Sequence, residues 1–219
     1  MSDYIVGIDE VGRGSLVGSA VVCAFRADDQ FFQTLPFEVI DSKKISQKKR
    51  EVIYDFFTSN KSLKFSYKIV IAKKKEIEKK NIHMAILESM AKAALGISKI
   101  SDQIIIDGKF LPKELIHLKA ETLVKADLKI KQVSAASIIA KVYRDKILKK
   151  LHLKENFYGW DKNAGYGTKN HLDAITSIGV SKFHRKTYQR ATGACKARRP
   201  ARCGRACRRC STASRSPRR

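Results

Sequence analysis

Gly7-Ile8-Asp9-Glu10-Val11-Gly12-Arg13-Gly14 is the stretch of this sequence that says most about its fold. The apolar run at residues 4–8 predicts a buried strand, and two carboxylates at the end of such a strand need a partner. Hard divalent cations bind carboxylate oxygens. Gly12 and Gly14 permit positive φ or close approach of the backbone to a ligand, and the guanidinium of Arg13 suits a phosphate. The stretch therefore predicts a metal site beside a phosphate site, and an ordinary glycine-rich turn with solvated charges is the alternative.

Similar apolar runs predict further strands over residues 17–25, 64–72, 103–106 and 121–124. Between and after them, helical spacing and polar N-cap residues predict helices that begin at Ser46, Asn81, Ser134 and Thr168. In the first of these helices, one face is expected to carry Val52, Ile53, Phe56 and Phe57. This alternation of strands and helices predicts an α/β fold with a central mixed sheet.

Carboxylates follow three of the predicted strands: Asp9 and Glu10 follow the first, Asp107 the fourth and Asp127 the last. Because ligands of α/β sheets bind at strand ends, these acids are expected to converge. Two unit charges about 4 Å apart repel each other by roughly 4 kcal/mol at an effective dielectric constant near 20, so convergence predicts bound cations. A pair of divalent ions is the arrangement used for in-line phosphodiester displacement. Taken singly, Asp107 also fits a turn and Asp127 a surface charge.

Charge points to a polyanionic partner. The chain has 45 basic and 21 acidic residues in 219, a formal charge of +24. Residues 190–219 contain ten Arg, one Lys and no acid, and they are expected to form a disordered basic tail after a domain spanning residues 1–189. Four of the five cysteines lie in this tail, where a zinc site is the alternative to disorder. No apolar run approaches a membrane span, and the N-terminus lacks a signal-peptide pattern. The one cysteine before the tail, Cys23, has no partner cysteine there, which fits a reducing cytosol.

Several motifs in a fixed order resemble those of bacterial ribonuclease HII, and the resemblance covers about residues 4–189. They are Asp9-Glu10-Val11-Gly12-Arg13-Gly14, Asp41-Ser42-Lys43-Lys44, Asn81-Ile82, Asp107-Gly108, the run 134–145, Gly165-Tyr166-Gly167-Thr168 and His184-Arg185. The resemblance implies a ribonuclease H-like fold, Mn²⁺ or Mg²⁺, and endonucleolytic cleavage of RNA in RNA–DNA hybrids and at single ribonucleotides in duplex DNA. The related ribonuclease HIII would place an extra domain before the first strand.

The same resemblance implies roles for individual residues. The catalytic, metal-binding acids are Asp9, Glu10, Asp107 and Asp127. The substrate-binding residues are the ribose-sensing Gly12, Arg13 and Gly14, the phosphate-contacting Lys43 and Lys44, the groove-shaping Ser134 and Lys141, and Tyr166 near the sugar. The chain departs from the family pattern at Ser15, Ser19, Lys109 and Asn163-Ala164.

Three further expectations concern pairing, assembly and alternative functions. Asp145 lies four residues after Lys141, which predicts a helical ion pair. A monomer is expected. The alternatives to a ribonuclease H are another metal-dependent nuclease of similar fold, such as a junction resolvase, and a basic protein that coats nucleic acid without catalysis. Acids at strand ends favour a nuclease over a coating protein.

Overall fold

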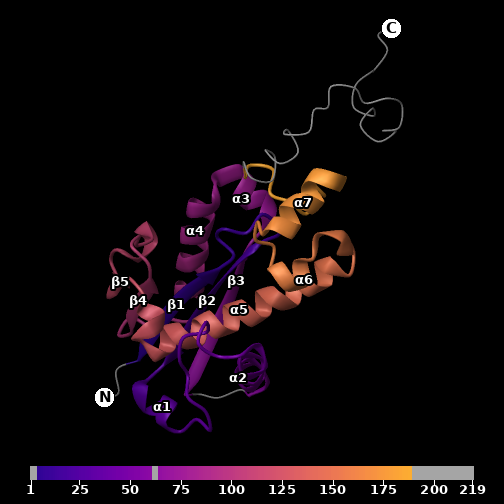
Figure 1. Ribbon diagram of the computed structural model, residues 1–219. Coiled ribbons are helices and arrows are strands. Elements are labelled where there is room, and N and C mark those ends of the chain that lie inside the picture. Colours follow the sequence, from indigo (N-terminus) through magenta and orange to yellow (C-terminus); the bar gives the residue numbers. More distant parts are fainter. Residues whose placement is uncertain (1–3, 61–63, 189–219) are drawn as a thin grey trace, which may run out of the picture.

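A mixed five-stranded sheet with helices on both faces forms the centre of the protein (Figure 1). The computed structural model describes residues 4–60 and 64–188. The strands are β1 (Ile5–Val11), β2 (Ala20–Ala27), β3 (Phe65–Ala72), β4 (Gln103–Asp107) and β5 (Ala120–Leu123). They lie in the order β3-β2-β1-β4-β5. The pairs β3–β2 and β2–β1 are antiparallel, whereas β1–β4 and β4–β5 are parallel. The predicted mixed α/β sheet is confirmed.

Helices cover the sheet and extend beyond it. The α-helices are α1 (Asp29–Gln33), α2 (Gln47–Ser59), α3 (Lys74–Lys80), α4 (Ile82–Leu95), α5 (Lys131–His152), α6 (Trp160–Asn163) and α7 (Lys169–Ile178). Short 3₁₀ turns are η1 (Lys113–Leu115), η2 (Ala126–Leu128) and η3 (Asn156–Tyr158). Within the described part of the chain, no helix is both long and apolar enough to cross a membrane.

Strand β2 shows how the two faces of the sheet are filled. Val22 packs in a cluster with Ile86 of α4, whereas the neighbouring Val21 packs in a second cluster with Ile139 of α5. Successive side chains of a strand point to opposite faces. Every residue of β2 is buried, so its sequence is apolar without alternation from Ala20 to Phe25, and the buried Arg26 pairs with Asp102.

Gly7 lets α5 lie directly across β1. A Cβ atom at this position would be 2.3 Å from the backbone nitrogen of Val133, so any larger residue would push the helix off the strand. This close approach places the residues of α5 that follow Val133 beside the carboxylates of β1.

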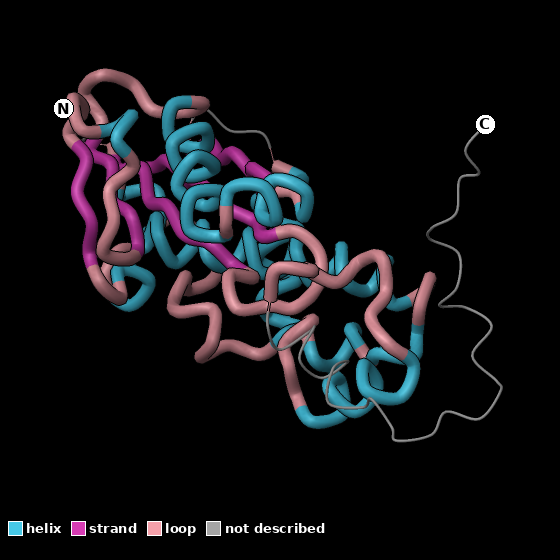
Figure 2. Tube along the Cα trace, turned by 90° about the horizontal axis from the view of Figure 1, so that it is seen from above, coloured by secondary structure: helices cyan, strands magenta, loops and turns pink. Residues whose placement is uncertain are grey.

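The far end of α5 carries a second, smaller core. Leu148 of α5 packs with Trp160 of α6 and Ile175 of α7, and Leu16 and Val17 from the loop after β1 complete the cluster. Figure 2 shows the strands gathered on the side of the N-terminus and this helical region beyond them. The loop after β1 is therefore held between the sheet and the C-terminal helices.

The predicted helix starts are confirmed at three positions and wrong at one. Ser46, Asn81 and Thr168 are N-caps whose side chains accept backbone N–H bonds from α2, α4 and α7 respectively. Helix α5 begins earlier than predicted, at Lys131, so Ser134 lies inside its first turn. The prediction for α2 was also wrong in one respect, because Val52 is exposed.

Candidate active site

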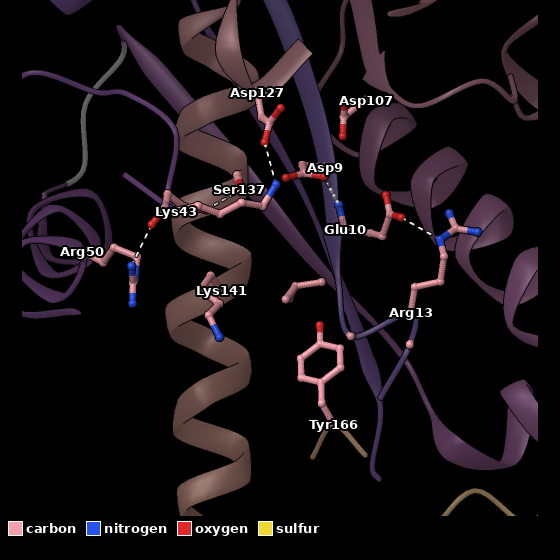
Figure 3. A pocket seen from close by; sticks show the side chains of 14 residues that line it. Asp9, Glu10, Arg13, Lys43, Arg50, Asp107, Asp127, Ser137, Lys141 and Tyr166 are labelled. Atoms are coloured by element: carbon pink, nitrogen blue, oxygen red, sulfur yellow. Dashed lines mark hydrogen bonds and ion pairs between the residues drawn. The ribbon is translucent and has the colours of Figure 1, made fainter. Parts of the chain in front are cut away.

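A cleft of about 360 Å³ opens beside the middle of the sheet. Its lining comes from β1, the loop after β1, the loop before α2, the end of β4, η2, α5 and the loop after α6 (Figure 3). The residues that line it are Asp9, Glu10, Val11, Gly12, Arg13, Gly14, Ser42, Lys43, Arg50, Asp107, Asp127, Ser137, Lys141 and Tyr166. All the sequence-predicted site residues except Lys44 and Ser134 are among them.

The four predicted acids share this cleft, and two of them, Asp107 and Asp127, lie at or beyond the end of a strand as expected. Asp107 is the last residue of β4. Asp9 and Glu10 lie inside β1, which continues to Val11, because β2 pairs with the strand over its whole length. Asp127 lies in the 3₁₀ turn η2, beyond the end of β5. The convergence predicted for strand ends is thus produced by two strands and one turn.

Burial makes this group of acids costly to ionise without a cation. Desolvation, followed by repulsion from Glu10, raises the pKa of Asp9 to about 8. Desolvation also raises the pKa of Glu10 and that of Asp107. A hydrogen bond from Ser137 acts in the opposite direction on the pKa of Asp9 but does not outweigh burial. Ionisation of these buried carboxyl groups therefore requires additional positive charge close to them.

Two basic side chains supply part of that charge. Arg13 Nε lies 2.8 Å from Glu10 Oε1, and Lys43 Nζ lies 3.2 Å from Asp127 Oδ2 (Figure 3). The ion pair to Asp127 raises the pKa of Lys43. Both bases are exposed, with Lys43 at 81% side-chain exposure, whereas the Asp127 side chain is 5% exposed. Opening this pair therefore leaves a buried carboxylate that needs another cation.

The loop after β1 and Tyr166 form the lower rim of the cleft. Gly12 has a φ of +93°, and a Cβ there would lie 2.2 Å from Arg144 Nε, so only glycine fits. Gly14 faces the ring of Tyr166, and a Cβ atom at Gly14 would lie 3.7 Å from Tyr166 Cε1. Tyr166 is 40% exposed and points its hydroxyl towards the acids in Figure 3. We call the space between Gly14 and this ring the Gly14–Tyr166 gap.

Two predicted residues lie outside the cleft. Lys44 and Ser134 line a neighbouring cavity of about 280 Å³. The buried hydroxyl of Ser134 donates to the carbonyl of Asp127 at 2.8 Å, so it supports the turn that carries this acid. Lys141 does line the cleft and also forms the predicted ion pair with Asp145, at 2.9 Å.

Sequence reasoning missed four residues of the cleft, the apolar Val11 and three polar ones. Ser42 and Ser137 lie within quoted motifs, and their hydroxyl oxygens are 3.0 Å apart. Arg50 of α2 donates to the carbonyl of Ser42 at 2.7 Å and so braces the loop that carries Lys43. The position of Ser42 directly before Lys43 indicated that it could belong to the site. Nothing in the sequence around Arg50 indicated a role in the site.

The donor chemistry of the cleft fits hard divalent cations, which prefer carboxylate oxygens. Within the described ranges, however, no three acidic, His or Cys side chains are already close enough to ligate one ion together. Glu10 and Asp127 are turned to Arg13 and Lys43 instead. Metal binding at these acids therefore requires the two bases to move aside.

Comparison with known proteins identifies the family. Residues 6–191 match the sequence model of ribonuclease HII. The chain belongs to the ribonuclease HII family. Ribonuclease HII of Pelagibacter ubique (strain HTCC1062) is 44% identical over 184 residues, which cover 84% of this chain and 95% of the relative. That of Roseobacter denitrificans is 37% identical over 185 residues, covering 84% and 89%.

A solved structure agrees with this assignment. The crystal structure of ribonuclease H2 from Pyrococcus horikoshii OT3 superposes with a TM-score of 0.72 at 25% identity and covers 89% of this chain and 98% of that one. The expected ribonuclease H-like fold is confirmed. This ribonuclease HII is accordingly an endoribonuclease with ribonuclease H activity on RNA–DNA hybrids, which decides against a nucleic-acid coating protein.

Proposed function

We propose that this ribonuclease HII, besides hydrolysing RNA in RNA–DNA hybrids, cuts duplex DNA at a single embedded ribonucleotide with the help of two divalent cations. The observation that supports this proposal is the composition of one cleft. Its upper part carries four carboxylates, and its lower rim carries a glycine-bracketed loop and an exposed tyrosine. Metal chemistry and recognition of a sugar can thus occur at neighbouring points.

The proposed ligands of Mn²⁺ or Mg²⁺ are Asp9, Glu10, Asp107 and Asp127. When bound, a pair of such ions activates water and stabilises the leaving oxygen in phosphodiester hydrolysis. The raised pKa values of three of these acids support the assignment, because a cation is what would keep such buried carboxylates ionised. Arg13 and Lys43, released from their acids, are then free to contact phosphates.

Recognition of the ribonucleotide is assigned to the Gly14–Tyr166 gap. A single 2′-hydroxyl is the local difference between RNA and DNA. Gly12 and Gly14 offer backbone groups that no side chain of their own shields, Arg13 can hold the adjacent phosphate, and the ring of Tyr166 offers a flat surface for the sugar at the junction. The loop and the ring lie close enough together to contact the same nucleotide, one beside the other, and to test its 2′ position.

Four further residues are proposed to hold the rest of the duplex. Lys43 lines the cleft and Lys44 lines the neighbouring cavity, so the two are suited to successive phosphates. Lys129 and Lys131 also line that cavity and add to its positive charge. Lys141 lines the cleft from α5. Ser134 contributes indirectly, by supporting the turn of Asp127.

The proposed organisation is a monomeric, cytoplasmic enzyme with its catalytic domain in residues 1–189. The basic tail at 190–219, including the alternative of a zinc site at its cysteines, lies outside the described residues. Its excess of ten Arg and one Lys supports a role in non-specific attraction to nucleic acid.

The test is cleavage of two substrates, a long RNA–DNA hybrid and a DNA duplex with one ribonucleotide, with Mn²⁺, with Mg²⁺ and with a chelator. Wild-type protein is expected to cut both substrates only with metal. Asp107→Asn is expected to abolish both cleavages, whereas Asp173→Asn on exposed helix α7 serves as the matched control and should retain them. Metal-dependent cleavage of the hybrid alone would refute the proposed action on single ribonucleotides.

A further inference from the structure

The motif His184-Arg185 lies far from the acids in sequence and outside the cleft, yet both side chains are fully buried. The segment that carries them runs beside the loop after β1. The amide of Arg185 donates to the carbonyl of Leu16 at 2.8 Å, and the amide of Gly18 donates to that of Phe183 at 3.0 Å. The C-terminal segment is thus fastened directly to the loop that forms one side of the Gly14–Tyr166 gap.

The guanidinium of Arg185 fixes the centre of that loop. Its Nη1 donates to the carbonyl of Arg13 at 3.2 Å, and its Nε donates to the carbonyl of Gly18 at 2.9 Å. The hydroxyl of Tyr188 donates to the same Arg13 carbonyl at 2.7 Å and accepts from Arg185 at 3.0 Å. Among the described residues no carboxylate pairs with Arg185. Its Nε and Nη1 donate to backbone carbonyls and to the Tyr188 hydroxyl, and its buried Nη2 has no hydrogen-bond partner there.

His184 reaches the other side of the gap through His171. The two Nε2 atoms are 3.1 Å apart, and Nδ1 of His171 lies 2.8 Å from the carbonyl of Tyr166. Trp160 Nε1 is 3.1 Å from the same Nε2 of His171. The amide of Ser181 donates to Nδ1 of His184 at 2.9 Å.

These contacts determine where the protons lie. An indole N–H can only donate, so Nε2 of His171 accepts from Trp160 and Nδ1 carries the proton that is donated to the Tyr166 carbonyl. A backbone N–H likewise only donates, so Nδ1 of His184 accepts from Ser181 and its Nε2 donates to Nε2 of His171, whose one lone pair is shared between this bond and the bond from Trp160. Both rings are neutral in this arrangement, in agreement with burial lowering the pKa of each.

We propose that His184 and Arg185 are positioning residues for recognition of the ribose. Arg185 and Tyr188 fix the position of the Arg13 carbonyl by hydrogen bonds. His184 fixes the position of the Tyr166 carbonyl through its hydrogen bond to His171. Because the two residues are adjacent in one segment, they tie both sides of the Gly14–Tyr166 gap to each other. This inference rests on the proposed function of that gap.

Two kinds of variant separate positioning from mere stability. Tyr188→Phe removes one hydroxyl at a partly exposed site, and Tyr67→Phe on β3 is its matched control. At His171, the side-chain amide of Asn occupies the place of Nδ1 and can still donate to Tyr166, whereas that of Gln occupies the place of Nε2 and cannot. His171→Asn and His171→Gln therefore disturb the buried network to a similar extent but differ in the contact to Tyr166.

The experiment measures kcat/KM with Mn²⁺ on the single-ribonucleotide duplex and on the long hybrid, together with thermal melting. Tyr188→Phe is expected to lower kcat/KM on the single-ribonucleotide duplex by about three- to ten-fold, the factor of one neutral hydrogen bond. On the hybrid, which offers a 2′-hydroxyl in every register, the loss is expected to be smaller. His171→Gln should lose the same preference, and His171→Asn should keep it at a similar melting temperature.

Hydrogen–deuterium exchange of the peptides covering residues 10–18 and 163–168 provides a readout that does not depend on activity. Faster exchange in residues 10–18 of Tyr188→Phe, with Tyr67→Phe unchanged, shows that this contact positions the loop. If wild-type protein also fails to cut at single ribonucleotides, the proposed function and the link to the ribose are refuted while the positioning of the loop stands. Unchanged exchange and an unchanged substrate preference in Tyr188→Phe would overturn it. Equal losses of preference in the two His171 variants, in proportion to their melting temperatures, would overturn the role of His184.

Discussion

Lys43 Nζ lies 3.2 Å from Asp127 Oδ2. A basic side chain suited to a phosphate is thus paired with a carboxylate suited to a metal ion. Arg13 has the same relationship to Glu10 at 2.8 Å. The two pairs neutralise half of the predicted metal ligands, while Asp9 and Asp107 stay without a basic partner at ion-pair distance among the described residues. On the proposed function, metal ions held by these acids would replace the side-chain cations and leave the two bases free for the substrate.

Replacing Lys43 is expected to weaken substrate binding more than turnover. Lys43→Ala should raise KM on the hybrid and reduce the slope of log K against log salt concentration by about one, because one phosphate contact is lost. Lys80→Ala is the control, since Lys80 pairs with Glu88 at 2.7 Å on another part of the surface. Binding titrations at four salt concentrations measure the slope. An unchanged slope in Lys43→Ala would show that Lys43 serves only to pair with Asp127.

Replacing Asp9 is expected to abolish cleavage and to stabilise the metal-free protein. Because the pKa of Asp9 is raised from 3.8 to about 8, the folded state holds a proton that the unfolded chain releases, and stability contributed by this group falls as pH rises across that window. Asp9→Asn should therefore melt roughly 2–6 °C above wild type at pH 8 without metal. At pH 5 the difference should be smaller.

Added Mn²⁺ should reverse this order. Ligands that bind only the folded state raise the melting temperature, so wild type should gain stability with Mn²⁺ and Asp9→Asn should gain little. Differential scanning calorimetry at both pH values, with Asp173→Asn as the control, measures both effects. Equal Mn²⁺-induced shifts in Asp9→Asn and wild type would remove Asp9 from the metal site.

Two glycines of the recognition loop are expected to respond differently to alanine. Gly12→Ala places a Cβ at positive φ and against Arg144, so it should cost at least about 1–2 kcal/mol and lower the melting temperature by roughly 2–8 °C. Gly14→Ala meets only the edge of Tyr166, at 3.7 Å, so it should melt like wild type and yet cut the single-ribonucleotide duplex poorly. Full activity of Gly14→Ala would mean that the ribose does not approach this backbone.

The buried histidines are expected to stay neutral in mildly acidic solution. Burial, followed by the neighbouring His171, lowers the pKa of His184 to about 4. The unfolded chain takes up protons near pH 6.5, so the stability contributed by the neutral pair is complete above that value and is lost as pH falls towards 4. Imidazole ¹⁵N spectra at pH 5.5 should show Nδ1–H in His171 and Nε2–H in His184. A charged ring at that pH would contradict the assigned hydrogen-bond chain.

The parts of the fold that were predictable are those with a strong local pattern. The apolar runs of β1 and β4 and the capped helix α4 carry their own signals, so the acids attached to them could be assigned. Helix α3 could not, because Lys-Lys-Glu-Ile-Glu-Lys-Lys contains one apolar residue and its helix is decided by burial of Ile77 in the core. The start of α5 was missed because its N-cap is Ile130, which lacks a capping side chain.

The same limit explains what was missed in the site. Carboxylates and glycines in a motif predict metal binding and close backbone approach. The sequence does not distinguish a buried arginine from a solvated one. Arg144 and Arg185 are buried to within about 1% exposure and bind only backbone carbonyls and one tyrosine hydroxyl. Their role depends on loops that are distant in sequence, and only the folded chain brings those loops together.

We propose that cleavage at the four acids depends on recognition of one 2′-hydroxyl beside Tyr166. The most direct measurement is single-turnover cleavage, with Mn²⁺, of two DNA duplexes that differ only in one 2′-hydroxyl. Wild-type protein is predicted to cut the duplex that carries the hydroxyl and to leave the other intact. Tyr166→Ala is predicted to cut it roughly ten- to a hundred-fold more slowly at an unchanged melting temperature, since stacking is worth about 1–3 kcal/mol. Equal cleavage of the two duplexes, or wild-type rates in Tyr166→Ala, would contradict the account.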